Sequence, residues 1–323
     1  MKASITSVAH FTPDKVVPNS FFKLASDEDY IRRKTGIEER RYFDGATSDM
    51  LVPAIQNCLQ KRGIGIDDVD CLIVGTVTPD YQFPSTAAAT LHKLNATKPW
   101  GFDLSAACAG FIYGLQLGSS LIESGAAKKV LVCGADKMST TVNFEDIKTS
   151  ILFGDGAGVV LLEKAKDEKY GIQHIVCKMY AQGLHDIYIP GGGTANPLTP
   201  HTLEAKADKM VMNGRVVFES GVASMSSVAK EVLETSNTSI NEIDYLLTHQ
   251  SNLRMIEGVV DSLGIAMERV LVNIQGHGNT CAATIPICLS EFYEKGVIKK
   301  GDKILITAIG SGFAYGAAII TWN

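Results

Sequence analysis

The chain has 323 residues, of which 46% are hydrophobic and 20% are charged. This composition provides about two domains' worth of buried core and excludes an intrinsically disordered chain. The net charge of −5 argues against general nucleic-acid binding. No apolar run reaches the roughly 18 residues of a membrane span, and the first residues lack the layout of a signal peptide. The seven cysteines form no C-x-x-C pair, so we expect a reducing cytoplasm and packing roles for six of the seven thiols.

Three segments of the first half of the chain recur in the same order about 174 residues later. They are residues 66–77 with 240–250, residues 108–125 with 281–296, and residues 129–132 with 303–306. Each half is predicted to run helix, short apolar strand, helix, strand, which indicates an α/β fold. The runs CLIVGTV, KVLVCGA and KILITAI are continuously apolar, as expected for strands buried on both faces. We therefore expect two pseudosymmetric lobes whose equivalent helix starts meet in the middle.

Residues 184–214 have no counterpart in the first half and are predicted to form a loop. Loops of that length in a compact domain are usually functional. GSGFAYG at 310–316 is predicted to join two strands, where glycine would let a backbone N–H face a ligand, although a tight hairpin explains it equally well. GDGAG at 154–158 precedes a strand, which excludes a phosphate-binding loop.

Cys108 follows the strand-like GFDLS and is predicted to open a helix. The positive end of the helix dipole and the free N–H groups there favour a thiolate, which makes Cys108 a candidate nucleophile. A small buried packing residue is the alternative interpretation. No metalloprotease motif, Cys/His cluster or calcium loop is present, so we predict no metal. The absence of G-x-S-x-G argues against a serine hydrolase.

His249 ends the apolar strand YLLTH, and Asn252 can cap the helix that follows. Asn279 precedes the second copy of the Cys108 helix, so the repeat places it across the pseudo-twofold axis from Cys108. A structural histidine and a helix cap are the simpler interpretations. Strand ends and helix starts of this kind converge between lobes, which favours one site containing all three residues.

These motifs together resemble the β-ketoacyl-acyl-carrier-protein synthase III family. The resemblance rests on AACAGF, HQSNLR and GHGNTCAA in this order, with FGDGAG, IPGGGT, TGIEER and GSGFAYG also matching, and it covers essentially the whole chain. It implies the thiolase-like five-layer αβαβα fold of two duplicated βαβα lobes. We expect an N-terminal lobe at 1–168 with the nucleophile and a C-terminal lobe at 169–323 with the histidine and asparagine.

The resemblance implies a Cys-His-Asn triad of Cys108, His249 and Asn279. Cys108 would take an acyl group from a coenzyme A thioester, and malonyl-acyl carrier protein would then lose CO₂ and attack that acyl group. His249 and Asn279 would donate to the enolate oxygen, while the backbone N–H groups of Cys108 and Ser311 would form an oxyanion hole. The implied activity begins fatty-acid synthesis and uses no cofactor beyond these two substrates.

The resemblance also implies a set of substrate-binding residues, namely Tyr30, Lys34, Phe83, Met212, Gly214, Arg254 and Phe313. Phe83 matches a position that closes the partner's acyl pocket across a homodimer interface, which implies a short primer, although phenylalanine is also an ordinary core residue. The expected partners are acyl-CoA, acyl carrier protein and a second copy of the chain, with neither nucleic acid nor membrane.

Several positions depart from the family pattern and affect the choice of substrate. Tyr30 and Ile147 stand where many members have a Trp and an Arg that clamp adenine, and Lys34 stands where Arg is usual. Asp261 and Glu219 replace lysines that some members use toward the acidic carrier. A specialised condensing enzyme or acyltransferase of secondary metabolism is therefore the main alternative.

Two further alternatives are weaker. A non-catalytic partner subunit would be expected to lose the nucleophile, whereas all three triad residues are present. A thiolase without decarboxylation would be expected to have a second cysteine near GSGFAYG, and that segment has none.

Overall fold

The computed structural model of the chain describes residues 2–22 and 28–323. Its strands form two main sheets and two small two-stranded ones. The first main sheet has the order β1-β7-β6-β4-β5, with β1 (Ala3–Phe11), β4 (Cys71–Gly75), β5 (Trp100–Leu104), β6 (Lys129–Lys137) and β7 (Asp155–Lys164). The second has the order β11-β12-β13-β8, with β8 (Gly171–Met179), β11 (Tyr245–Thr248), β12 (Lys303–Gly310) and β13 (Ala314–Thr321). The predicted boundary at residue 168 falls in the connection between β7 and β8 and remains a prediction.

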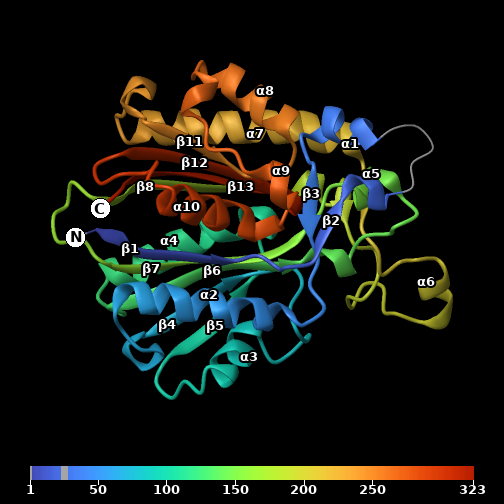
Figure 1. Cartoon of the computed structure of the whole chain (residues 1–323), viewed down its shortest axis with the longest axis horizontal. Coiled ribbons are helices and arrows are strands. Elements are labelled where there is room, and N and C mark those ends of the chain that lie inside the picture. Colours follow the sequence, from blue (N-terminus) through green and yellow to red (C-terminus); the bar gives the residue numbers. More distant parts are fainter. Residues whose placement is uncertain (1, 23–27) are drawn as a thin grey trace.

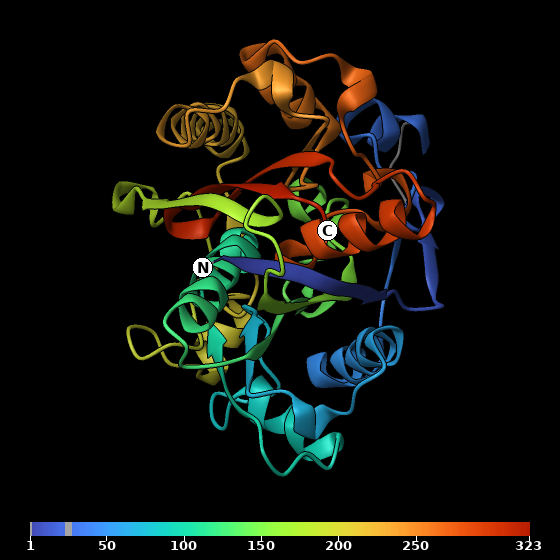
Figure 2. The ribbon, with the colours of Figure 1, turned by 90° about the vertical axis from the view of Figure 1, so that its left-hand side faces the viewer.

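Helices cover both sheets and fill the space between them (Figures 1 and 2). The outer face of the first sheet packs against α2 (Thr47–Arg62) and α3 (Thr86–Lys93), and that of the second against α7 (Gly214–Thr235) and α8 (Leu253–Leu263). Between the sheets lie α4 (Gly110–Glu123) and α10 (Thr284–Glu294). The predicted thiolase-like five-layer αβαβα arrangement of two lobes is confirmed.

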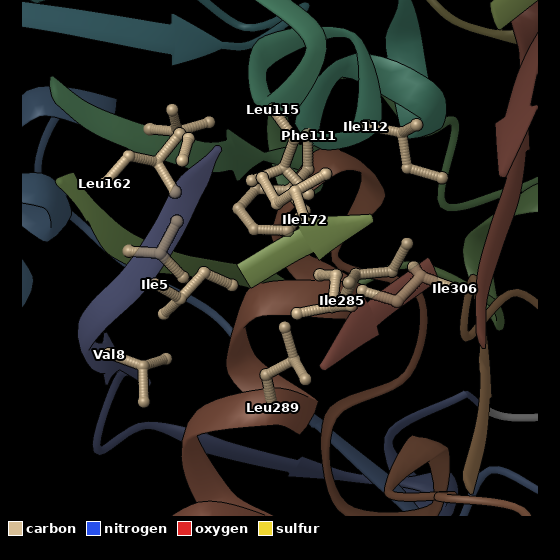
Figure 3. Close-up of a cluster of buried hydrophobic side chains, with 14 of the residues drawn as sticks. Ile5, Val8, Phe111, Ile112, Leu115, Leu162, Ile172, Ile285, Leu289 and Ile306 are labelled. Atoms are coloured by element: carbon tan, nitrogen blue, oxygen red, sulfur yellow. The ribbon is translucent and has the colours of Figure 1, made fainter. Parts of the chain in front are cut away.

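The central layer is held by apolar side chains that both sheets share with α4 and α10 (Figure 3). Phe111 and Leu115 of α4 and Ile285 of α10 are fully buried there. β4 is buried along its whole length, as its continuous apolar sequence predicts. Truncating one such side chain to alanine typically costs about 2–5 kcal/mol, so this layer fixes where the starts of α4 and α10 meet.

The remaining elements are short and lie near one end of the layers (Figure 1). They are β2 (Val16–Pro18), α1 (Glu28–Thr35), β3 (Glu39–Arg41), α5 (Ile147–Ser150), β9 (Ile187–Tyr188), α6 (Pro200–Glu204), β10 (Val211–Met212) and α9 (Ile274–His277). The predicted loop at 184–214 thus contains the small β9–β10 pair and the single turn of α6. No helix in the described segments is both long and apolar enough to cross a membrane.

The starts of α4 and α10 correct the alignment of the repeat by one residue. Each helix follows a 3₁₀ turn, Ala107–Ala109 before α4 and Cys281–Ala283 before α10. Ala107 (φ +46°) and Cys281 (φ +53°) both adopt the left-handed conformation, which is rare outside glycine. Cys281 therefore corresponds to Ala107 rather than to Cys108. Cys108 lies within the first turn, two residues before α4 begins.

The two lobes touch backbone to backbone where β6 meets the second of these turns. A Cβ atom at Gly134 would lie 2.1 Å from the carbonyl oxygen of Ala282, so only glycine allows this approach. Two residues further along β6, the buried Asp136 carboxylate accepts a hydrogen bond from the Ala282 N–H at 3.1 Å. The same carboxylate accepts hydrogen bonds from the N–H and hydroxyl groups of residues 76–78. The turn at 281–283 is thereby fixed to the first sheet.

We predict that Gly134→Ala lowers the free energy of unfolding by about 1–3 kcal/mol, because the added methyl group meets backbone that cannot rotate away. Urea unfolding followed by circular dichroism measures this change. Gly276→Ala is the matched control, because a Cβ there has no heavy atom within 4 Å, and we expect it to stay within about 0.5 kcal/mol of wild type. Equal unfolding midpoints for the two variants would show that this backbone contact is not tight.

Candidate active site

Cys108 lies where two cavities meet, and its side chain is partly exposed. The first, named here the His249 cavity, has a volume of about 120 Å³. The second, the Cys281 cavity, has a volume of about 230 Å³. Both are many times larger than the ~10–15 Å³ needed for one water molecule. Each can therefore accept an organic group next to the Cys108 thiol.

The two cavities differ in chemistry. The His249 cavity contains His249, Asn279 and Asn252 among apolar side chains. The Cys281 cavity is almost entirely apolar, and its walls include Met138, Met210, Ile187, Ile189 and Phe153. The thiol thus faces polar donors on one side and an apolar chamber on the other.

The Cys108 thiol is paired with a second thiol. Its Sγ atom lies 3.5 Å from the Sγ atom of Cys281, and the two groups are hydrogen-bonded. The hydrogen bond from Cys281 lowers the pKa of Cys108 well below its ordinary value, and the neighbouring His249 lowers it further, against the opposing effect of burial. The hydrogen bond to Cys108, burial and the nearby Asp136 raise the pKa of Cys281 well above its ordinary value. These opposite pKa shifts favour the thiolate form on Cys108 and the protonated thiol on Cys281.

His249 follows the last residue of β11, as the sequence predicts, and is buried. Its N–H donates to the carbonyl oxygen of Thr307 at 2.8 Å, which holds the residue against β12. The imidazole Nδ1 lies 2.7 Å from the hydroxyl of Thr284, in the first turn of α10. When that hydroxyl donates to Nδ1, the proton of a neutral ring is on Nε2, which makes Nε2 a donor.

Hydrogen bonds fix both the backbone and the side chain of Asn279. Its N–H donates to the carbonyl of Leu152 at 2.8 Å, and its own carbonyl accepts from the N–H of Gly154 at 3.0 Å. Its side-chain Oδ1 accepts from the N–H of Cys281 at 2.8 Å. Since Oδ1 is used in this way, the amide NH₂ is the group that Asn279 can offer to a ligand in the His249 cavity.

The backbone at residues 310–311 lies directly beside Cys108. A Cβ atom at Gly310 would lie 2.7 Å from the Cys108 nitrogen and 2.5 Å from the Ala106 oxygen, so glycine is required there. Ser311 lines both cavities, and its hydroxyl donates to the carbonyl of Ile187. The segment joins β12 to β13, as predicted.

The other predicted substrate-binding residues fall into two groups. Met212, Gly214 and Phe313 line the His249 cavity. Tyr30, Lys34, Arg254 and Phe83 do not line either cavity in the described part of the chain.

Tyr30 and Lys34 share α1, with the Lys34 ammonium 5.9 Å from the centre of the Tyr30 ring. Arg254, on α8, donates to the backbone carbonyl of Arg33 at 3.0 Å. Phe83 is 86% exposed and borders a separate surface hollow. Ile147 packs against an apolar cluster that includes Ile31 of α1.

Comparison with known proteins identifies the family. Residues 102–182 match the family model for 3-oxoacyl-[acyl-carrier-protein] synthase III, and residues 233–322 match the model for its C-terminal part. A β-ketoacyl-[acyl-carrier-protein] synthase III from Chlorobaculum tepidum is 41% identical over 331 residues, covering 100% of both chains. The chain belongs to the β-ketoacyl-[acyl-carrier-protein] synthase III family. It is a condensing enzyme of the acyltransferase type.

Solved structures agree with this assignment. The 3-oxoacyl-[acyl-carrier-protein] synthase III from Aquifex aeolicus has a TM-score of 0.92 and 35% identity, covering 99% of this chain and 100% of its own. The priming β-ketosynthase from the R1128 polyketide biosynthetic pathway has a TM-score of 0.91 and 29% identity, covering 99% of this chain and 96% of its own. The architecture of this synthase is therefore similar to that of a 3-oxoacyl-[acyl-carrier-protein] synthase III and to that of a priming ketosynthase named for a polyketide pathway.

Sequence reasoning missed three residues that the site depends on. The sequence predicts a packing role for six of the seven thiols; Cys281 is buried in an apolar cluster, and its thiol also contacts Cys108. Thr284 and Asp136 also have partners that the sequence did not indicate. The motif GNTCAA does place Cys281 next to the predicted triad asparagine, and this was the available signal. In residues 2–22 and 28–323, no group of three or more potential ligands is arranged to hold a metal ion.

We predict that Cys281→Ala moves the pH midpoint of Cys108 alkylation by iodoacetamide to higher pH. The thiolate is the reactive form, so the rate rises as pH passes through the Cys108 pKa and levels off above it. Removing the Cys281 donor raises the pKa of Cys108, so the alkylation rate reaches its plateau at a higher pH. Cys281→Ser keeps a hydroxyl donor and should retain most of the wild-type profile. The same midpoint in Cys281→Ala and wild type would show that Cys281 does not stabilise the thiolate.

Proposed function

We propose that this synthase condenses an acyl-CoA primer with malonyl-acyl carrier protein to a 3-oxoacyl-acyl carrier protein, which begins fatty-acid synthesis. The position of Cys108 between a polar and an apolar cavity is the observation that carries the proposal. Cys108, His249 and Asn279 are the proposed catalytic residues. The reaction needs two binding places beside one sulfur atom, one for the acyl chain of the primer and one for the malonyl thioester. The two cavities are the proposed places.

In the first half-reaction, the Cys108 thiolate attacks the thioester carbonyl of the primer. Coenzyme A leaves as a thiolate and takes up a proton, and the acyl group remains on Sγ. The backbone N–H groups of Cys108 and Ser311 are the proposed oxyanion hole, supported by the close approach of residue 310 to the Cys108 nitrogen. The apolar Cys281 cavity is the proposed site of the acyl chain.

In the second half-reaction, the malonyl thioester occupies the His249 cavity and loses CO₂. The electrons of the breaking bond form an enolate, whose oxygen accepts hydrogen bonds from His249 Nε2–H and the Asn279 amide. The enolate carbon attacks the acyl group, and Cys108 leaves as a thiolate. Decarboxylation supplies the carbanion without a strong base, so the site needs donors rather than acceptors.

Thr284 is a proposed positioning residue in this step. Its hydroxyl contacts Nδ1 of His249 and lies 3.2 Å from the carbonyl of Cys281, to which it can also donate. Turning the hydroxyl toward Nδ1 fixes the neutral tautomer that donates from Nε2. Turning it toward the carbonyl suits the imidazolium form, in which Nδ1–H donates to Thr284.

The proposal also names two protein partners. Acyl carrier protein is the proposed carrier of the second substrate. A homodimer is the proposed assembly, supported by the highly exposed Phe83 and its neighbour Tyr81, which is 61% exposed. A large ring at Phe83 suits a short primer.

A priming enzyme of secondary metabolism is the second candidate, favoured by the similarity to the R1128 ketosynthase and by Ile147, which offers no cation to an adenine ring.

We predict that His249→Ala slows CO₂ release about a hundredfold while slowing acyl transfer to Cys108 much less, because the enolate donor is needed only in the second step. Thr284→Val should slow CO₂ release about tenfold, since it removes one hydrogen bond that orients the ring, and Thr284→Ser should restore it. The measurement is a single turnover of acetyl-enzyme with malonyl-acyl carrier protein labelled in the free carboxyl group. Equal slowing of both steps by His249→Ala would reject this role for the histidine.

A further inference from the structure

We propose that Cys108 and Cys281 form a reversible intramolecular disulfide when the enzyme meets hydrogen peroxide, and that this modification protects the nucleophile from irreversible oxidation. The disulfide does not depend on the proposed condensation, which enters only in the consequence that the oxidised enzyme cannot accept an acyl group. The two sulfur atoms lie 3.5 Å apart and need to approach to about 2 Å to form the bond.

The backbone of Cys281 holds its thiol beside Cys108. The Cys281 N–H donates to Asn279 Oδ1 at 2.8 Å, and the next N–H, of Ala282, donates to Asp136 at 3.1 Å. Thr284 contacts the Cys281 carbonyl at 3.2 Å. The left-handed φ of +53° at Cys281 is fixed by these three contacts. The hydrogen-bonded 281–283 turn therefore sets the position of the Cys281 thiol beside Cys108.

The two thiols have different roles in the oxidation. The Cys108 thiolate attacks one peroxide oxygen, the O–O bond breaks, hydroxide leaves, and Cys108 becomes a sulfenic acid. The sulfur of Cys281 then attacks the Cys108 sulfur, the S–O bond breaks, and the departing hydroxide takes the Cys281 proton to leave as water. Cys108 and Cys281 together lose two electrons to the peroxide. A dithiol reductant returns both cysteines to thiols by thiol–disulfide exchange and is itself oxidised to a disulfide.

The cavity beside the two thiols and the burial of the other cysteines support this assignment. Cys108 and Cys281 both line the Cys281 cavity, which is large enough for peroxide. Cys58, Cys71, Cys133 and Cys288 are buried in the apolar clusters, and Cys177 packs against one of them. Without Cys281, a Cys108 sulfenic acid would have no nearby thiol with which to react and would proceed to sulfinic acid.

The test treats the reduced, substrate-free enzyme with a small molar excess of hydrogen peroxide and measures its intact mass. We expect wild type to lose two hydrogen atoms and to regain them with dithiothreitol. Trypsin should then yield peptide 94–128, whose cysteine is Cys108, joined to peptide 270–295, which contains Cys281 and Cys288. Cys288→Ala removes the ambiguity in the second peptide and is the matched control, with the same expected mass loss.

Cys281→Ser should instead gain two oxygen atoms on Cys108, as a sulfinic acid, and dithiothreitol should not restore its original mass. Oxygen gain without loss of two hydrogen atoms in wild type, at the rate seen in Cys281→Ser, would overturn the proposal. If Cys281→Ser does not fold, the joined peptides in wild type and Cys288→Ala decide alone, and their absence overturns it. Failure of the condensation assay leaves this result untouched, because no substrate is present.

Discussion

One buried carboxylate connects the two lobes at the point where the site forms. Asp136 accepts hydrogen bonds from residues 76–78 of its own lobe and from the Ala282 N–H of the other lobe. Burial raises the pKa of Asp136 to about 6, against the opposing effect of the backbone donors, so the group is a carboxylate at neutral pH. Gly134 allows the approach that this contact needs. The turn before α10 thus has a defined place beside the turn before α4.

The chemistry of the site follows from this one placement. Asn279 lies before the fixed turn, Cys281 within it and Thr284 directly after it, so the donors toward Cys108 and His249 share a single origin. The two lobes have similar backbones here but different side chains. One turn supplies the thiolate, and the other supplies the thiol that stabilises it. The duplicated backbone therefore positions the two turns, and the side chains that differ between them determine the chemistry of the site.

The sequence predicts the fold well, because strands and turns depend on local patterns, and the three residues of the candidate triad line one cavity. Apolar runs set the strands, and Cys108, His249 and Asn279 each lie at a strand or turn boundary within a specific motif. The contact between Cys108 and Cys281 could not be predicted, since it depends on how two distant turns pack. Asp136 was missed because a polar residue at a strand end gives no indication of burial. The one-residue error in the repeat arose because matching cysteines were aligned, whereas the backbone aligns Cys281 with Ala107.

The most direct test of this account is intact-mass spectrometry of the enzyme mixed with a panel of acyl-CoAs and acyl-carrier-protein thioesters. Wild type should gain one acyl group, from a short acyl-CoA most rapidly, while Cys108→Ala gains none and Cys288→Ala behaves as wild type. Loading only from carrier proteins or longer chains would favour the priming enzyme of secondary metabolism. An acyl adduct on Cys108→Ala, or none on wild type from any donor, would contradict Cys108 as the nucleophile between the two cavities.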